Sequence, residues 1–120
     1  MLNEKEARQT CEAVLRMVGQ DPAEVYLLAE ELALTRFAAN AIHQNVTEQN
    51  QRLRLRLRRG GRVGEAITNR SSPSDLEALV ARARALAGLA AEDPDLPELT
   101  GVQEYLPAEA FDAATAGMSP

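Results

Sequence analysis

The chain has 120 residues, a formal net charge of −5 at pH 7, only 3% aromatic residues and no Trp. This length suits one domain with a single modest core, and the aliphatic composition leaves few rings that could stack on bases, sugars or flat cofactors. The acidic balance argues against general affinity for nucleic acid. Residues 52–70 differ, because they hold seven arginines and one glutamate, so we expect a local basic face on an acidic protein.

The sequence also argues against a disulfide-bonded, membrane-spanning or secreted protein. Cys11 is the only cysteine, so the chain cannot form an intramolecular disulfide. No apolar run reaches the roughly 18 residues of a transmembrane helix, and the polar start of the chain lacks the apolar region of a signal peptide. We therefore expect a cytoplasmic protein that does not enter a membrane.

The first expected element is a helix that begins after Asn3. Asn3 and Glu6 have the spacing of a capping box, and Gly19, followed by Asp21-Pro22, is typical of a helix end. Apolar residues recur at helical spacing and are expected on one face: Ala7, Cys11, Val14, Leu15 and Val18.

The next part of the chain is predicted to contain two strands, residues 25–31 and 32–39. The turn between them is placed near Glu30 to Ala33, although turn-forming residues are scarce there. The polar stretch 40–50 is expected to be a loop or an irregular extension of a strand.

Residues 51–59 carry the clearest strand pattern, because leucine and arginine alternate with a period of two. Gly60-Gly61 suits a two-residue hairpin turn in which both residues need positive φ. Such a turn places large residues opposite small ones on one face, which leaves room for a helix. The expected pairs are Leu57 with Gly64, Leu55 with Ala66, Leu53 with Thr68, Arg56 with Glu65, and Arg54 with Ile67.

A second helix is predicted to begin at Ser72-Pro73-Ser74-Asp75, where Ser is the N-cap and Pro the first helical residue. Its buried stripe is expected to hold Leu76, Leu79, Val80, Ala83, Leu86, Ala87 and Ala90. The sequence thus predicts an α+β fold with about four mostly antiparallel strands, two helices packed on one face, and then an extended C-terminal tail. Residues 1–91 form the expected domain, and residues 92–120 an acidic, Pro-containing linker toward a missing C-terminal domain. Ser119-Pro120 is itself a helix start, which is typical of a fragment.

No residue is predicted to be catalytic or to bind metal. His43 is the only histidine, whereas zinc sites need three or four converging ligands, so a polar loop histidine is the simpler interpretation. Cys11 lies on the apolar helix face and is expected to act as a small hydrophobe. Gly60 to Gly64 lies between strands, so a hairpin explains it better than a phosphate loop.

Taken together, the chain resembles the N-terminal domain of the TldD/PmbA family, whose members are described as modulators of DNA gyrase and as zinc-dependent peptidases. The likeness covers roughly residues 20–120. The residues that carry it are Arg36, Phe37, Asn40, Ile42, His43, Gln44, Gly60, Gly61 and Gly64. Ala39 departs from the pattern, because Asn or Ser is expected there.

The resemblance implies a non-catalytic domain or fragment of a zinc metallopeptidase that acts in proteolysis or peptide maturation. Such a domain would help form the enclosure and the subunit interface of an oligomer. Its implied partners are a TldD/PmbA-like subunit or the missing C-terminal domain, with a peptide as the substrate of the full assembly. Zinc is expected only in a full-length active relative, and the resemblance does not separate the catalytic branch from the zinc-free one.

Two alternatives follow from the residues themselves. The chain could be a stand-alone interaction domain that offers the Arg-rich strand 52–58 to an acidic partner. A nucleic-acid role ranks third, because single-strand binders add aromatic stacking platforms to their basic residues.

Overall fold

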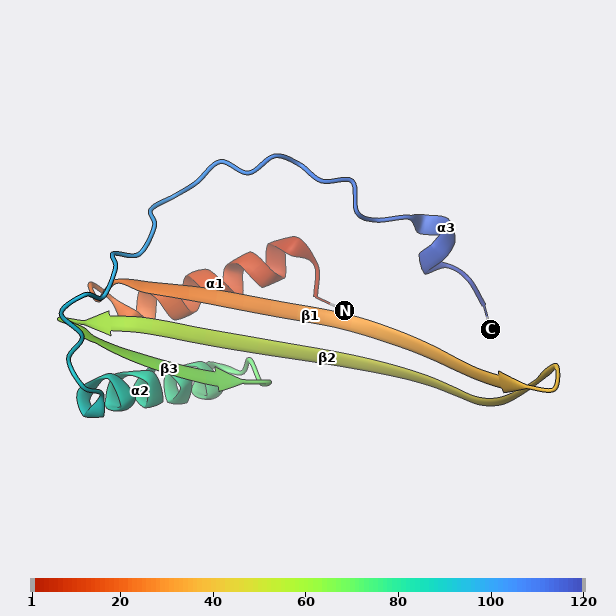
Figure 1. Cartoon of the computed structure of the whole chain (residues 1–120), viewed down its shortest axis with the longest axis horizontal. Helices are drawn as coiled ribbons and strands as arrows, with labels where there is room; N and C mark the ends of the chain where they lie inside the picture. Colours follow the sequence, from red (N-terminus) through yellow and green to blue (C-terminus); the bar gives the residue numbers. More distant parts are fainter. Residues whose placement is uncertain (1, 120) are drawn as a thin grey trace. The chain divides into compact units, whose positions relative to one another are not determined.

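The computed structural model describes residues 2–119 and has an α+β fold (Figure 1). The helices are α1 (Glu4–Val18), α2 (Pro73–Leu89) and α3 (Ala113–Ala116), and the strands are β1 (Ala23–Ala38), β2 (Ala41–Arg59) and β3 (Arg62–Thr68). The strands form one sheet in the order β1-β2-β3, with each strand antiparallel to the next (Figure 1). The predicted fold class is confirmed, with three strands where four were expected.

The chain divides into two compact units. The first, called the core unit below, contains the residues up to Glu31 together with Gln49–Leu99. The second contains Leu32–Glu48 and the residues from Thr100 onward. Each unit is described by itself.

The missing fourth strand results from the position of the first turn. The turn predicted near Glu30 to Ala33 is wrong, because β1 runs on to Ala38 and the chain reverses at Ala39 and Asn40. Both turn residues have positive φ, 49° and 60°, as a type I′ hairpin turn requires. The expected loop at 40–50 therefore forms the first part of β2.

The β2–β3 pairing has the predicted register. Leu57 pairs with Gly64, Leu55 with Ala66 and Leu53 with Thr68, while Arg56 pairs with Glu65 and Arg54 with Ile67. The expectation of positive φ at both turn glycines is wrong for the second one, because only Gly60 has a positive φ, 61°. This pattern fits a type II′ turn, which needs glycine at its first central position alone.

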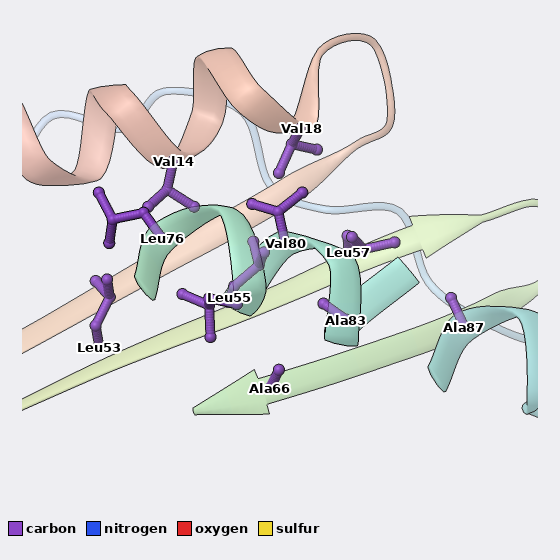
Figure 2. Packing of buried hydrophobic residues seen from close by; sticks show 11 residues of the cluster. Val14, Val18, Leu53, Leu55, Leu57, Ala66, Leu76, Val80, Ala83 and Ala87 are labelled. Carbon is purple, nitrogen blue, oxygen red and sulfur yellow. The ribbon is translucent and has the colours of Figure 1, made fainter. Parts of the chain in front are cut away.

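The core lies between one face of the sheet and two helices (Figure 2). Three leucines of β2 form its floor, and Val14 and Val18 of α1 and the apolar stripe of α2 lie over them. The buried cluster consists of Val14, Val18, Leu53, Leu55, Leu57, Ala66, Leu76, Leu79, Val80, Ala83 and Ala87. The alternation of leucine and arginine in β2 thus separates a buried face from an open one.

The helix termini follow the predicted chemistry. Asn3 and Glu6 form a capping box, and Gly19 ends α1 with a φ of 74°. Ser72 caps α2 by accepting a hydrogen bond from the amide of Asp75. Two residues expected in the buried stripe of α2 are not among its buried residues: Leu86 is 43% exposed, and Ala90 is the partly buried C-cap.

The tail is mainly extended, as predicted, with one exception. Residues Ala113–Ala116 form the short helix α3, capped by the side chain of Asp112, which accepts a hydrogen bond from the amide of Thr115. That hydrogen bond lowers the pKa of Asp112, because it favours the ionised carboxylate. The predicted helix start at Ser119-Pro120 includes Pro120, which lies outside the described residues.

Candidate functional site

Six of the nine signature residues gather at the first hairpin, in the second unit. Arg36 and Phe37 lie near the end of β1, Asn40 is a turn residue, and the remainder begin β2. The remainder are Ile42, His43 and Gln44. One two-stranded ribbon, Leu32–Glu48, therefore presents this part of the signature.

The ribbon exposes several large apolar side chains to solvent. Phe37 is 76% exposed and Ile42 is 57% exposed, and Leu32 and Leu34 are also exposed. In the β2–β3 register, pairing begins only at Leu53. A two-stranded ribbon of this kind is marginally stable alone in water, and clustered exposed apolar residues mark surfaces that another molecule or domain covers.

The histidine of the ribbon shows no catalytic setting. His43 is exposed in β2, and among residues 2–119 no three His, Cys, Asp or Glu side chains are grouped as a metal ion would need. The polar contact found in the ribbon joins the hydroxyl of Thr35 to the side-chain oxygen of Asn45 across the strands, at 3.3 Å. This contact ties the two strands together and does not orient His43.

The three remaining signature residues, Gly60, Gly61 and Gly64, belong to the core unit, where Gly60 serves the turn and the other two lie in close contacts. A Cβ on Gly64 would overlap the carbonyl oxygen of Ala83 and lie 2.5 Å from the amide nitrogen of Ala87. Gly64 therefore lets the backbone of α2 approach β3 directly. The signature is thus divided between a surface ribbon and a structural contact.

Gly61 serves a second close contact, with the segment that follows α2. A Cβ on Gly61 would lie 2.8 Å from Cγ of Glu92 and 3.1 Å from the carbonyl oxygen of Asp93. The amide of Asp93 donates a hydrogen bond to the carbonyl oxygen of Gly61 at 2.8 Å. The β2–β3 turn therefore holds the start of the predicted linker.

Arg58 strengthens this contact. Its side chain is only 13% exposed, and its guanidinium donates hydrogen bonds to the carbonyl oxygens of Pro97, at 2.6 Å, and Leu96, at 3.3 Å. The carboxylate of Glu98 lies 4.0 Å away. We call residues 92–98 the strap. Sequence reasoning missed this role, because the residues that Arg58 contacts lie 38–39 positions later in the chain.

Three other arginines of β2 are also engaged within the chain. Arg56 lies 3.8 Å from Glu24 of β1, and the guanidinium of Arg54 lies over the ring of Tyr26, 5.5 Å from its centroid. Arg59 donates to Asp21 at 3.1 Å. The Arg-rich strand therefore binds its own sheet and loops as well as facing solvent.

Cys11 has the environment of a structural cysteine. It is partly buried on α1, and burial, together with the negative charge of Glu12, raises the pKa of its thiol. A nucleophilic cysteine needs a lowered pKa, so this thiol is suited to packing.

The helices show no membrane-spanning segment: within residues 2–119, none combines the length and apolarity needed to cross a bilayer.

Comparison with known proteins identifies the fold. The profile of PmbA/TldA metallopeptidase domain 1 matches residues 23–87, whereas no curated protein matches the sequence. The structure of TldE from Thermococcus kodakarensis is similar with a TM-score of 0.71 and 14% identity, over 94% of this chain and 25% of that one.

A second similar structure is that of a candidate modulator of DNA gyrase from Bacteroides thetaiotaomicron. Its TM-score is 0.61 and its identity 22%, over 100% of this chain and 28% of that one. At these identities the two structures show a shared fold alone. The chain spans about a quarter of the length of either protein.

Proposed function

This chain belongs to the PmbA/TldD family, in which its residues 23–87 correspond to the first domain, and from that premise we propose that it is a non-catalytic module of a larger metallopeptidase-type assembly. In this role it helps to build the enclosure and the subunit interface in which a peptide is processed. Its partner is a TldD/PmbA-like subunit or a C-terminal domain of the same kind. Zinc, where an assembly uses it, is expected in a full-length active relative, and a cytoplasmic location is part of the same proposal.

The observation that carries the proposal is the exposed apolar surface of the ribbon Leu32–Glu48. Phe37 and Ile42 come from the two strands on either side of one turn, and both are largely exposed. Burying one such side chain at an interface contributes about 1.5–3 kcal/mol. The ribbon holds one arginine and one glutamate among its 17 residues, so little charge opposes its burial against a neutral surface.

The tail of the second unit supports the same role. Its apolar side chains are exposed along its length: Val102, Tyr105, Leu106, Phe111 and Met118. An extended segment that carries such residues gains stability when a neighbouring domain or subunit covers them.

The test compares the ribbon with another exposed apolar position. The chain would be mixed with a TldD/PmbA-like subunit from the same source, and complex formation followed by sedimentation velocity. We expect Phe37→Ser and Ile42→Ser to weaken the complex while leaving the melting temperature unchanged. Leu89→Ser is the matched control, because Leu89 is 85% exposed at the end of α2.

Two outcomes would contradict the proposal. One is a complex that tolerates both ribbon substitutions as well as it tolerates Leu89→Ser. The other is zinc binding with peptide hydrolysis by the isolated 120-residue chain, since the chain would then be a catalyst by itself.

The alternative, a stand-alone domain that presents the Arg-rich strand 52–58 to an acidic partner, has less support. Arg54, Arg56 and Arg58 each have a partner within the chain. An acidic partner would have to compete with these contacts, and its binding would weaken steeply with salt.

A further inference from the structure

We propose that the core unit carries a binding site for a carboxylate that adjoins an apolar group, as at the C-terminal end of a peptide or in a short branched acid. The site is a hollow of about 630 Å³ at the end of β3, where Arg52 of β2 and Arg82 of α2 both line the wall. The site is independent of the subunit role proposed above, because it lies wholly in the core unit.

The first argument is the state of the two arginines. Within residues 2–119, neither Arg52 nor Arg82 has a carboxylate or carbonyl acceptor at hydrogen-bond or ion-pair distance. Most other arginines of residues 52–70 do have one: Arg56, Arg58, Arg59, Arg62 and Arg70. Two arginines that line one hollow and lack an acceptor suit a planar anion, which can accept charge-assisted hydrogen bonds from guanidinium groups.

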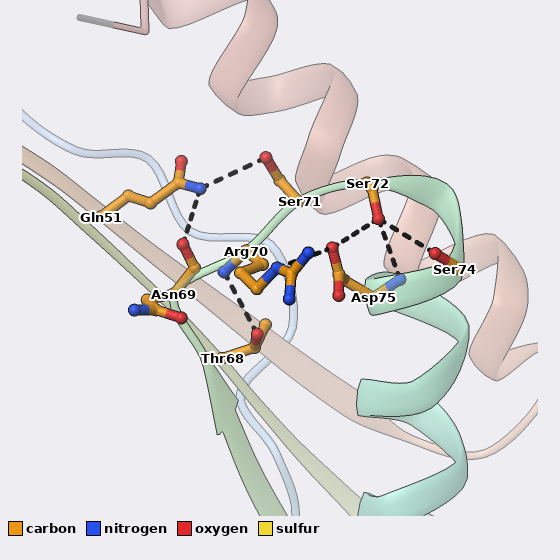
Figure 3. A network of polar contacts seen from close by, with 8 residues as sticks. All are labelled: Gln51, Thr68, Asn69, Arg70, Ser71, Ser72, Ser74 and Asp75. Atoms are coloured by element: carbon orange, nitrogen blue, oxygen red, sulfur yellow. Dashed lines mark hydrogen bonds and ion pairs between the residues drawn. The ribbon is translucent and has the colours of Figure 1, made fainter.

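The second argument is that the wall of the hollow is held in place. The side-chain nitrogen of Gln51 donates to the carbonyl oxygen of Asn69 at 2.9 Å and to the hydroxyl of Ser71 at 3.3 Å (Figure 3). Because both hydrogens of the amide are used, its oxygen is left as an acceptor. The amide of Arg70 donates to the hydroxyl of Thr68 at 3.2 Å, which fixes the turn after β3. A site whose walls are ordered before binding loses less entropy on binding.

The same network explains why Arg70 is not part of the site. Its guanidinium lies 3.4 Å from Asp75, at the start of α2 (Figure 3). Asp75 is also bound by the hydroxyl of Ser72. The charge of Arg70 is therefore already balanced, and the positive field of the hollow comes from Arg52 and Arg82.

The third argument concerns the shape and charge that a ligand needs. Leu28 and Ile67 line the hollow and are partly exposed, so they offer a patch for an apolar group. Glu30 is the one carboxylate in the lining, which leaves a net charge of about +1. One negative charge beside an apolar group fits this lining better than a phosphate, which carries more negative charge and which Glu30 would repel more strongly.

The test is an NMR titration of the isotope-labelled full chain, read on the side-chain amides of Asn50, Gln51 and Asn69, which line the hollow. The probes are N-acetyl-Ala-Leu with a free carboxylate, the same dipeptide as its C-terminal amide, isovalerate and inorganic phosphate. We expect shifts with the free dipeptide and none with its amide. Isovalerate as effective as the dipeptide would assign the site to small acids, and a weaker response would assign it to peptide ends.

Three variants test the residue assignment. Arg52→Gln and Arg82→Gln should each weaken binding about tenfold, as expected for the loss of one charge-assisted hydrogen bond at an exposed site. Glu30→Gln should tighten it, because a repulsive charge is removed. Arg36→Gln is the matched control, since it removes an arginine of the second unit.

The proposal fails if the free dipeptide and its amide behave alike, if phosphate binds more tightly than the carboxylates, or if Arg36→Gln weakens binding as much as Arg52→Gln. Equal melting temperatures across the variants would show that a loss of binding comes from the site and not from unfolding.

Discussion

Gly64 in β3 lies so close to Ala83 in α2 that a Cβ on the glycine would overlap the alanine's carbonyl oxygen. Backbone therefore meets backbone at this point, and neither side can move aside as a flexible side chain could. This contact sets the distance between α2 and the sheet, and with it the space that the leucines of β2 fill.

The substitution Gly64→Ala should therefore destabilise the core unit. We expect a loss of about 3 kcal/mol in the free energy of unfolding, at the upper end of ordinary overpacking, because the helix itself has to shift. The measurement is urea denaturation followed by far-UV circular dichroism. Gly88→Ala is the control, since a Cβ at Gly88 in α2 would meet nothing within 4 Å. That change should stabilise the helix by about 0.5–1 kcal/mol, and equal effects of the two substitutions would rule out the close contact.

The β2–β3 hairpin could be predicted from the sequence because several local signals agree. Leu53, Leu55 and Leu57 set the buried face, and a turn of two residues at Gly60 fixes which partner each one meets. A register that puts Gly64 opposite Leu57 also predicts where a helix can pack. Each of these inferences depends on residues that are close together in the chain.

The first hairpin could not be predicted in the same way. Its turn is formed by Ala39 and Asn40, and alanine is a poor residue for positive φ, so Asn40 alone indicated a turn there. Residues 41–50 are mostly polar and contain no leucine on either face of the strand, so the alternating pattern that predicts a strand was absent there. The strap was missed for a different reason, because its contacts join Arg58 to residues some 38–39 positions later.

Ala39 is consequently a position where the ribbon can be stabilised. Its φ of 49° costs a residue with a Cβ about 1 kcal/mol or more, so Ala39→Gly should slow local opening of the hairpin. Amide hydrogen exchange of the ribbon residues would measure this change. The control is Ala41→Gly, which puts a glycine in β2 outside the turn and should speed exchange. Faster exchange in Ala39→Gly would contradict the type I′ turn.

Arg84 connects the two helices of the core unit. One terminal nitrogen of its guanidinium donates to the carbonyl oxygens of Met17, at 3.0 Å, and Val18, at 2.9 Å. These are carbonyl groups at the end of α1, where a positive charge is favourable. Arg84→Met should therefore reduce the free energy of unfolding by about 1.5–3 kcal/mol, the range for hydrogen bonds to charged groups.

The conservative variant Arg84→Lys distinguishes the hydrogen bonds from the charge. A lysine keeps the positive charge near the end of α1 but lacks the rigid fork of the guanidinium. It should recover part of the stability lost in Arg84→Met, as measured by chemical denaturation. If both variants unfolded like the unmodified chain, the contact with Met17 and Val18 would contribute nothing.

Arg58 should control the order of the strap. In Arg58→Gln the hydrogen bonds to the carbonyl oxygens of Leu96 and Pro97 are lost or weakened, so residues 92–98 should become more mobile. The expected result is faster exchange of the Asp93 amide, which is protected by its hydrogen bond to Gly61, and faster cleavage of the strap by a protease. Arg59→Gln is the control, because Arg59 binds Asp21 instead. Equal cleavage of the two variants would show that Arg58 does not hold the strap.

Cys11 provides a test of burial that depends on pH. Burial raises the pKa of its thiol above the ordinary value of a cysteine, and the negative charge of Glu12 acts in the same direction. Since the thiolate is the reactive form, Cys11 in the folded chain should react with a disulfide reagent more slowly at pH 8 than it does in urea. Because the pKa of the thiol is higher in the folded chain, the protonated thiol contributes stability below its unfolded pKa. That contribution is lost as the pH rises through the folded pKa. Reaction rates that are equal in the folded and unfolded chains would show that α1 does not shield the thiol.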